Sequence, residues 1–230
     1  MEWTLFVIPM LHLLTPYLTF ERKKGDDIIF SSETLQTTHA HIIEHFVALY
    51  VSFQSLRLMQ NIIITLMLHA YFLKRIVEIL FVHSYSNENR GVIETSCKSI
   101  MFASYVTVIT NSRSNNDHPM VGFIVYLCGM IGNTIWHLKL RDLRQSQPLS
   151  HARPTDWLSQ RIVCPHYSFE CLIWIGIAIT KNNVYTGIIA YAITHHLYWR
   201  AFRTVTLYVS LFHEHEEAEL RKRLLIPYLL

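Results

Sequence analysis

The feature that most constrains the fold of this chain is Pro119–Trp136, a run of eighteen residues without a charged side chain. A bilayer span takes roughly 20 such residues, so this run is long enough to approach one. Further apolar stretches recur along the chain, at Trp3–Phe20, His41–Phe53, Asn61–Leu73, Ser99–Thr110, Cys171–Thr180 and Asn182–Trp199. The pattern predicts an all-α fold, a multi-pass transmembrane helical bundle of about seven helices.

The composition supports a membrane protein. Charged residues make up 16% of the chain, against about 25% in a typical soluble domain. Basic residues gather at Arg22–Lys24, at Arg141 and Arg144, and at Arg221–Arg223. With seven spans and the N-terminus outside, these groups share one side, which the positive-inside rule assigns to the cytosol together with the C-terminus. The net charge of +3 then belongs to loop flanks, and we expect no nucleic-acid partner.

Three further observations narrow the class of protein. The N-terminus lacks a basic region and a small-residue cleavage site, so we interpret Trp3–Phe20 as a retained first helix. The four cysteines have no Cys-x-x-Cys spacing, which favours buried thiols over a disulfide framework or a zinc site. Fourteen histidines are present, but few of them have the spacing that places two ligands on one helix face, and we expect no metal site.

Four polar residues follow the charge-free run at helical spacing. On a helix, Asn133, His137, Arg141 and Arg144 form a single stripe that emerges where the membrane meets the cytosol. Guanidinium groups bind phosphate through paired hydrogen bonds, so the stripe suits a nucleotide phosphate. The alternative is a positive-inside flank of arginines that extend to the interface.

The segment Cys164–Glu170 opens the next apolar stretch. Pro165 predicts a helix start, since proline is tolerated in the first turn. Tyr167 and Glu170 then share that turn, where a tyrosine can donate a hydrogen bond or a proton. The alternative is an interfacial tyrosine with a glutamate placed favourably at a helix N-terminus.

Three charges lie together in a further apolar stretch. Lys74 and Glu78 have the i, i+4 spacing of a helical ion pair, and Arg75 lies beside them. Charges at membrane depth need partners, so a structural ion pair is the simplest interpretation.

Three ordered segments, Lys74–Ser86 (KRIVEILFVHSYS), Asn133–Arg144 (NTIWHLKLRDLR) and Cys164–Ile179 (CPHYSFECLIWIGIAI), resemble the steroid 5α-reductase family. The closing Leu224–Leu230 (LLIPYLL) is similar to the C-terminal signature of that family. The resemblance is closest to the branch that reduces very-long-chain trans-2-enoyl-CoA. It divides the chain into N-terminal transmembrane helices, residues 1–72, which match weakly, and a catalytic domain, residues 73–230.

The resemblance implies a set of site residues. Tyr167 corresponds to the catalytic tyrosine of the family, and Glu44 is the best match for a second catalytic acid. The resemblance further implies substrate contacts and NADPH contacts. The substrate residues are Lys74 and Arg75, and the cofactor residues are Asn133, His137, Arg141, Arg144, His166, Glu170 and Tyr208.

Three positions depart from the family pattern. His166 replaces an asparagine beside the tyrosine, and an imidazole can still donate to a cofactor amide. Phe72 stands where steroid-reducing members have a tyrosine, which argues against a steroid bound in their manner. Val205 replaces the histidine of the C-terminal motif.

The resemblance implies an enzyme of the endoplasmic-reticulum membrane that reduces very-long-chain trans-2-enoyl-CoA with NADPH, the last step of fatty-acid elongation. The expected partners are the acyl-CoA substrate, membrane lipids and other subunits of fatty-acid elongation. Two enzymatic alternatives are a reductase of sterols or polyprenols and a membrane methyltransferase of the prenylcysteine type. A non-enzymatic scaffold or channel is the alternative from another class.

Overall fold

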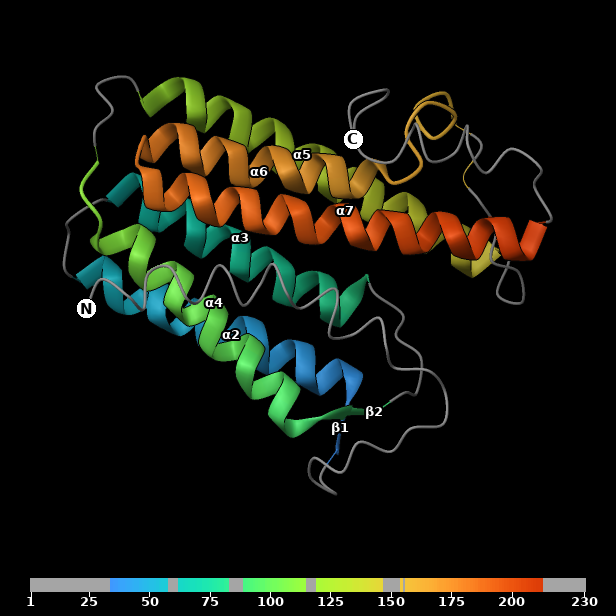
Figure 1. Ribbon diagram of the computed structural model, residues 1–230, viewed down its shortest axis with the longest axis horizontal. Coiled ribbons are helices and arrows are strands. Elements are labelled where there is room, and N and C mark those ends of the chain that lie inside the picture. Colours follow the sequence, from blue (N-terminus) through green and yellow to red (C-terminus); the bar gives the residue numbers. More distant parts are fainter. Residues whose placement is uncertain are drawn as a thin grey trace.

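The computed structural model describes residues 34–57, 62–82, 89–114, 119–146, 154 and 156–212. These residues form six helices and a short antiparallel ribbon (Figure 1). The helices are α2 (Thr37–Arg57), α3 (Ile62–Phe81), α4 (Val92–Asn111), α5 (Pro119–Ser146), α6 (Pro165–Lys181) and α7 (Val184–Phe212), and the ribbon pairs β1 (Thr34–Gln36) with β2 (Asn89–Gly91).

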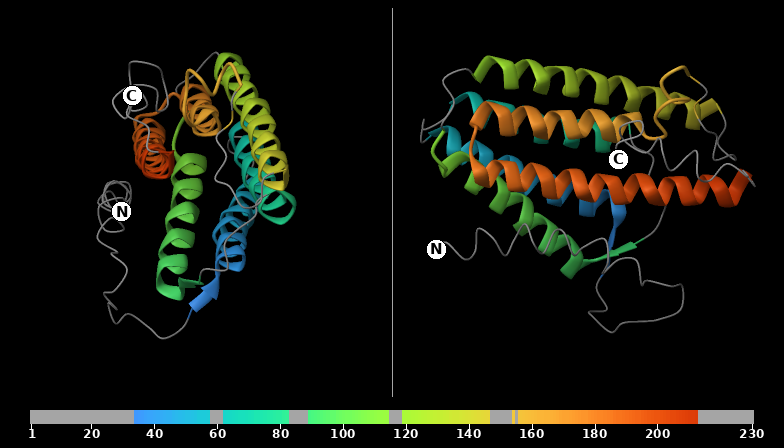
Figure 2. Two further views of the ribbon diagram at one scale, coloured as in Figure 1. Left: turned by 90° about the vertical axis from the view of Figure 1, so that its right-hand side faces the viewer. Right: turned by 45° about the horizontal axis from the view of Figure 1, so that its top comes forward.

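The six helices form a bundle in which each helix contacts its neighbours in the order α5, α6, α7, α4, α2 and α3. The arrangement closes because α3 also contacts α5 and α6, as the end-on view shows (Figure 2). Successive helices run in opposite directions. Helices α2 and α4 directly follow the two paired strands, so both start at the same end of the bundle. Helices α3, α5 and α7 finish at that end, and α6 begins there (Figure 1).

The opposite end is held by contacts between two connections. The Ser114 hydroxyl donates a hydrogen bond to the carbonyl of Lys181 over 3.2 Å, and the Asn183 amide donates to the carbonyl of Arg113 over 2.9 Å. The turn from α6 to α7 passes through Asn182, whose φ of 46° is left-handed, a conformation that asparagine tolerates better than most residues.

Helices α5 and α6 are antiparallel and approach very closely because glycines line their contact. A Cβ atom added at Gly129 would lie 2.7 Å from the backbone nitrogen of Ile173 and 2.8 Å from the carbonyl oxygen of Phe169. A Cβ atom added at Gly176 would meet the backbone of Tyr126 at 2.5 Å. Small residues that allow backbones to approach are typical of helix pairs within membranes.

Helices α3 and α5 are parallel and keep a constant register. The Tyr126 hydroxyl donates to the carbonyl of Met67 over 2.7 Å, and two turns further on Lys74 donates to the side chain of Asn133. Both pairs are separated by 59 positions in the sequence. The side of α5 that faces α3 is therefore the same side throughout, and Asn133 lies on it.

The structure agrees with the predicted helical pattern and extends it. Helices α2, α4, α5 and α6 each contain one of the apolar stretches, α7 begins two residues into the last stretch, and α3 continues through Lys74 and Arg75 without a break. The helices are longer than the stretches because their polar ends keep the helical conformation. The predicted first span, Trp3–Phe20, lies outside the described residues, and the count of seven therefore stays a prediction.

Two details differ from the sequence prediction. The three-residue strands β1 and β2 are absent from the all-α prediction, because so short a ribbon has no detectable alternation of its own. Cys164 and Cys171 are buried as expected, but the expectation is wrong for Cys97 and Cys128, which are exposed on the helix surfaces.

Large apolar side chains cover much of the outer surface. On α2 and α3, for example, Phe46 is 57% exposed, Leu66 is 51% exposed and Phe81 is 71% exposed. Helices α4 and α5 are long and apolar enough to cross a membrane. A surface of this kind is costly in water and natural in lipid.

Candidate active site

The polar residues singled out by the sequence gather at the end of the bundle where α6 begins. Lys74 and Arg75 lie in the second half of α3, Asn133 in the second half of α5, and Tyr167 in the first turn of α6 (Figure 1). The alternating directions of the helices bring these segments together although they are far apart in the sequence.

Tyr167 is held at the start of α6 by local structure. Pro165 occupies the first turn, and the Tyr167 amide donates to the carbonyl of Cys164 over 3.0 Å. The tyrosine ring lies 4.0 Å from the ring of His166, measured between centroids, and the guanidinium carbon of Arg200 lies 5.3 Å from the centroid of Tyr167. Among the described residues, the Tyr167 hydroxyl has no hydrogen-bond partner, so it can serve a ligand.

A chain of hydrogen bonds fixes the first turn of α6 to the two neighbouring helices. Lys74 donates to Oδ1 of Asn133 over 2.5 Å, and Nδ2 of Asn133 donates to the carbonyl of His166 over 2.7 Å. Asn133 is fully buried, and both ends of its amide are engaged. Asn133 therefore supports the turn that carries Tyr167, and the cofactor contact that the resemblance implies for it stays a prediction.

The charges of α3 are paired with one another. Lys74 lies 2.6 Å and Arg75 lies 3.1 Å from the two carboxylate oxygens of Glu78, which is 3% exposed. The predicted pair of Lys74 and Glu78 is confirmed. A buried carboxylate between two cations satisfies the requirement that charges in an apolar environment be paired.

Glu170 lies one turn after Tyr167 and is also buried. Its Oε1 accepts a hydrogen bond from the hydroxyl of Tyr71 over 2.8 Å, and Arg75 lies close enough to act on the carboxylate electrostatically. Sequence reasoning did not identify Tyr71, because no motif marks it and its partner lies 99 positions away.

The predicted stripe on α5 is divided by depth. Asn133 and His137 are buried, and the ring of His137 lies 5.5 Å from the ring of His166. Arg141 and Arg144 lie on the last turns of α5, where Arg144 is exposed and Arg141 pairs with the adjacent Asp142 at 3.1 Å. The inner half of the stripe thus supports α6, and the outer half presents cations to the surface.

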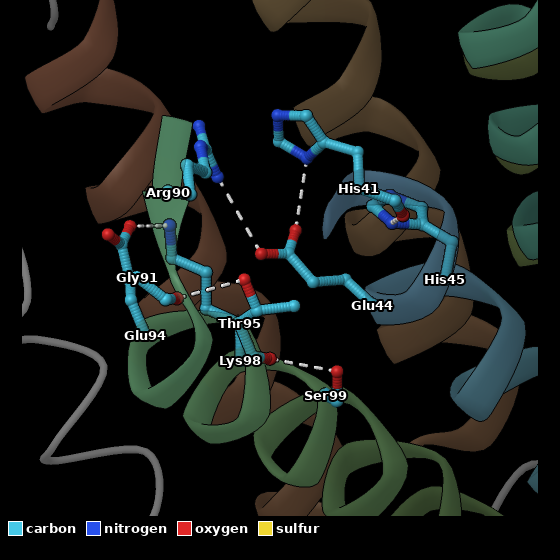
Figure 3. A network of polar contacts seen from close by, with 9 residues as sticks. All are labelled: His41, Glu44, His45, Arg90, Gly91, Glu94, Thr95, Lys98 and Ser99. Carbon is cyan, nitrogen blue, oxygen red and sulfur yellow. Dashed lines mark hydrogen bonds and ion pairs between the residues drawn. The ribbon is translucent and has the colours of Figure 1, made fainter. Parts of the chain in front are cut away.

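Glu44 lies in a separate cluster on α2, shown in Figure 3. Its carboxylate accepts a hydrogen bond from His41 at 3.0 Å and pairs at 3.6 Å with Arg90, which belongs to β2. The partners of Glu44 therefore come from α2 and from the ribbon. Its role as a second catalytic acid beside Tyr167 stays a prediction.

Arg200 of α7 lies over the ring of Tyr167, with 5.3 Å between its guanidinium carbon and the ring centroid. Sequence reasoning missed it, although a cation directly after the apolar stretch Asn182–Trp199 was a signal in the sequence. Tyr208 lies two turns further along α7 and packs against the core.

The Val205 departure has a structural explanation. This side chain is 1% exposed and belongs to the hydrophobic core. An apolar residue therefore suits the position in this chain.

Two surface grooves lie towards the other end of the bundle. The groove between α3 and α5 has a volume of about 370 Å³ and is lined by apolar residues, among them Leu66, Ala70, Met120 and Phe123. The groove between α6 and α7 has a volume of about 770 Å³ and includes Asn182 and Asn183. Ala70 lies one turn before Lys74, so the first groove ends close to the polar cluster.

Comparison with known proteins identifies the class. Residues 87–230 match the family described as 3-oxo-5-alpha-steroid 4-dehydrogenase. This match covers more than half of the chain, and the chain belongs to that family, whose members are oxidoreductases that reduce double bonds.

Two relatives are similar to parts of the chain. A very-long-chain enoyl-CoA reductase of Dictyostelium discoideum is 26% identical over 127 residues, which cover 52% of this chain and 42% of the relative. A polyprenal reductase of Xenopus laevis is 31% identical over 87 residues, which cover 34% of this chain and 27% of the relative. The chain thus matches less than half of the length of either relative.

Proposed function

We propose that this chain is a membrane-embedded enzyme that reduces the trans-2 double bond of a very-long-chain enoyl-CoA with NADPH, the last step of fatty-acid elongation. The observation that carries the proposal is the environment of Tyr167. Its hydroxyl has no hydrogen-bond partner among the described residues, and Arg200 lies over its ring. A proton donor beside a cation suits a reaction in which negative charge develops on a substrate oxygen.

Tyr167 has two tasks in the proposed reaction. NADPH, when bound, supplies a hydride to the β-carbon of the substrate. The Tyr167 hydroxyl donates a hydrogen bond to the thioester oxygen, where the charge of the enolate develops. The same hydroxyl then delivers a proton to the α-carbon and regains one from solvent, so that the substrate gains one hydride and one proton. No step depends on Glu44.

Cations at this end of the bundle suit the phosphates of NADPH. Arg141 and Arg144 lie at the C-terminal end of α5, where arginine side chains can reach phosphates in water. Arg200 adds a third cation on the side of α7. Asn133 holds the first turn of α6, which carries Tyr167, through its bonds to Lys74 and to the carbonyl of His166.

The surface supports a lipid substrate and a membrane location. Exposed apolar side chains cover the helices, and the groove between α3 and α5 leads to within one turn of Lys74. A hydrocarbon tail would follow this groove while the thioester reaches Tyr167. In the proposed topology, the chain crosses the endoplasmic-reticulum membrane several times, with its C-terminus and the end that carries Tyr167 in the cytosol. Other subunits of fatty-acid elongation would be its partners there.

The direct test is the oxidation of NADPH by the detergent-purified chain with trans-2-hexadecenoyl-CoA. Consumption of NADPH should match the formation of the saturated acyl-CoA. A steroid enone and a polyprenal serve as comparison substrates. Turnover of the enone or the polyprenal without turnover of the enoyl-CoA would overturn the assignment of substrate.

Reduction of a polyprenal is the second candidate function. The polyprenal reductase is 31% identical to this chain over 87 residues. The enoyl-CoA reductase has a lower identity, 26%, over a longer match of 127 residues. An isoprenoid tail would suit the same apolar groove. The comparison of substrates therefore decides whether an enoyl-CoA or a polyprenal is reduced at this site.

A further inference from the structure

The carboxylate of Glu170 can contact a cofactor in a defined way only if its oxygens have a fixed direction. It lies one turn after Tyr167 on α6 and is 7% exposed. A buried carboxylate is stable only when hydrogen bonds or cations satisfy its oxygens. If Glu170 contacts the cofactor, as the resemblance implies, at least one oxygen must be held so that the other has a fixed direction.

Tyr71 meets this requirement from another helix. Its hydroxyl donates to Oε1 of Glu170 over 2.8 Å, across the contact between α3 and α6. Hydrogen bonds to a charged acceptor are the stronger ones. Tyr71 thus binds one carboxylate oxygen and leaves the other for a ligand.

Tyr71 is itself held rigidly. It is 4% exposed, and its ring packs edge-on against Trp174 and against Phe72, with 5.1 Å between centroids in both cases. Trp174 lies one turn after Glu170, so α6 contacts the tyrosine through two successive turns. The hydroxyl therefore has little freedom to leave the carboxylate.

We propose that Tyr71 is a positioning residue that directs the second carboxylate oxygen of Glu170 towards bound NADPH. This inference rests on the proposed function. Because Tyr71 acts through Glu170, its loss should weaken cofactor binding and leave the proton transfer by Tyr167 largely intact. It also explains why a tyrosine outside the recognised motifs lies at the centre of the site.

The test is Tyr71→Phe in the full chain, which removes one hydroxyl and keeps the ring. We expect the Kd for NADPH to rise about tenfold, the lower range for loss of a hydrogen bond to a charged group, with kcat within about threefold of the original. Tyr126→Phe is the matched control, because it removes a buried hydroxyl that also bonds to α3. This control should leave the Kd for NADPH unchanged.

A double-mutant cycle separates positioning from general loss of structure. In a Glu170→Gln background, Tyr71→Phe should change the Kd for NADPH by less than about twofold. Equal effects of Tyr71→Phe with and without Glu170 would overturn the inference, and so would an unchanged Kd in the single variant. If the unaltered chain does not bind NADPH, both the proposed function and this inference fail.

Discussion

Lys74 of α3 donates a hydrogen bond to the side chain of Asn133 of α5, and the other end of that amide donates to the carbonyl of His166 at the start of α6. Three helices thus meet at one fully buried amide. The position of Tyr167 depends on this junction, because Tyr167 directly follows His166. Two of the residues that the resemblance assigns to ligands, Lys74 and Asn133, therefore also have a structural task.

The first prediction concerns the junction itself. Asn133→Ala removes the side chain that bonds to both the partly buried ammonium of Lys74 and the carbonyl of His166, so each group loses a hydrogen bond. We expect the free energy of unfolding to fall by about 1–3 kcal/mol, the range for unsatisfied buried polar groups. Thermal unfolding in detergent measures the change. Thr134→Ala is the control, since that hydroxyl bonds to the carbonyl of Met130 within its own helix. Equal stability of the two variants would contradict the structural task of Asn133.

A second prediction uses two glycines in different environments. Gly129→Ala would place a Cβ atom 2.7 Å from the backbone of Ile173, so α5 and α6 must separate, whereas Gly187 has nothing within 4 Å of the added atom. We expect Gly129→Ala to cost about 1–3 kcal/mol through overpacking. Gly187→Ala should gain up to about 1 kcal/mol from helix propensity. Opposite shifts in melting temperature would support the close helix contact, and shifts of the same sign would contradict it.

The sequence was informative wherever a local signal was enough. Pro165 marked the start of α6, and the spacing of Lys74 and Glu78 gave their ion pair. These features depend on neighbouring residues.

Long-range partners could not be read from the sequence alone. The bond from Tyr71 to Glu170 and the pair of Arg90 with Glu44 depend on how elements that are distant in the sequence are arranged in space. The prediction that Asn133, His137, Arg141 and Arg144 share a helix face was correct. The division of this face into a buried and an exposed half depends on how far along α5 the contact with α6 extends.

A third prediction concerns the outer half of that stripe. Arg141→Ala and Arg144→Ala should each raise the Kd for NADPH more than that for acyl-CoA, because both arginines belong to the stripe proposed to hold the phosphates of the cofactor. Titration of each ligand against the purified variants measures the difference. Lys139→Ala is the control, since Lys139 pairs with Asp156 and lies over the ring of Trp136. Unchanged cofactor affinity in both arginine variants would reduce these residues to determinants of topology.

The last prediction tests the chemistry at Tyr167. Tyr167→Phe removes one hydroxyl and keeps the ring that packs on His166 and lies under Arg200. If the hydroxyl stabilises the enolate and supplies the proton, kcat should fall by about 10²-fold or more, the scale for loss of one such group. The Kd for NADPH should change little, because the variant keeps the ring under Arg200, and Arg141 and Arg144 lie on another helix. Unfolding temperature provides the control for folding, and the hydroxyl has no partner to lose among the described residues. A folded variant that reduces the enoyl-CoA at the original rate would remove Tyr167 from the mechanism and leave the proton without a donor.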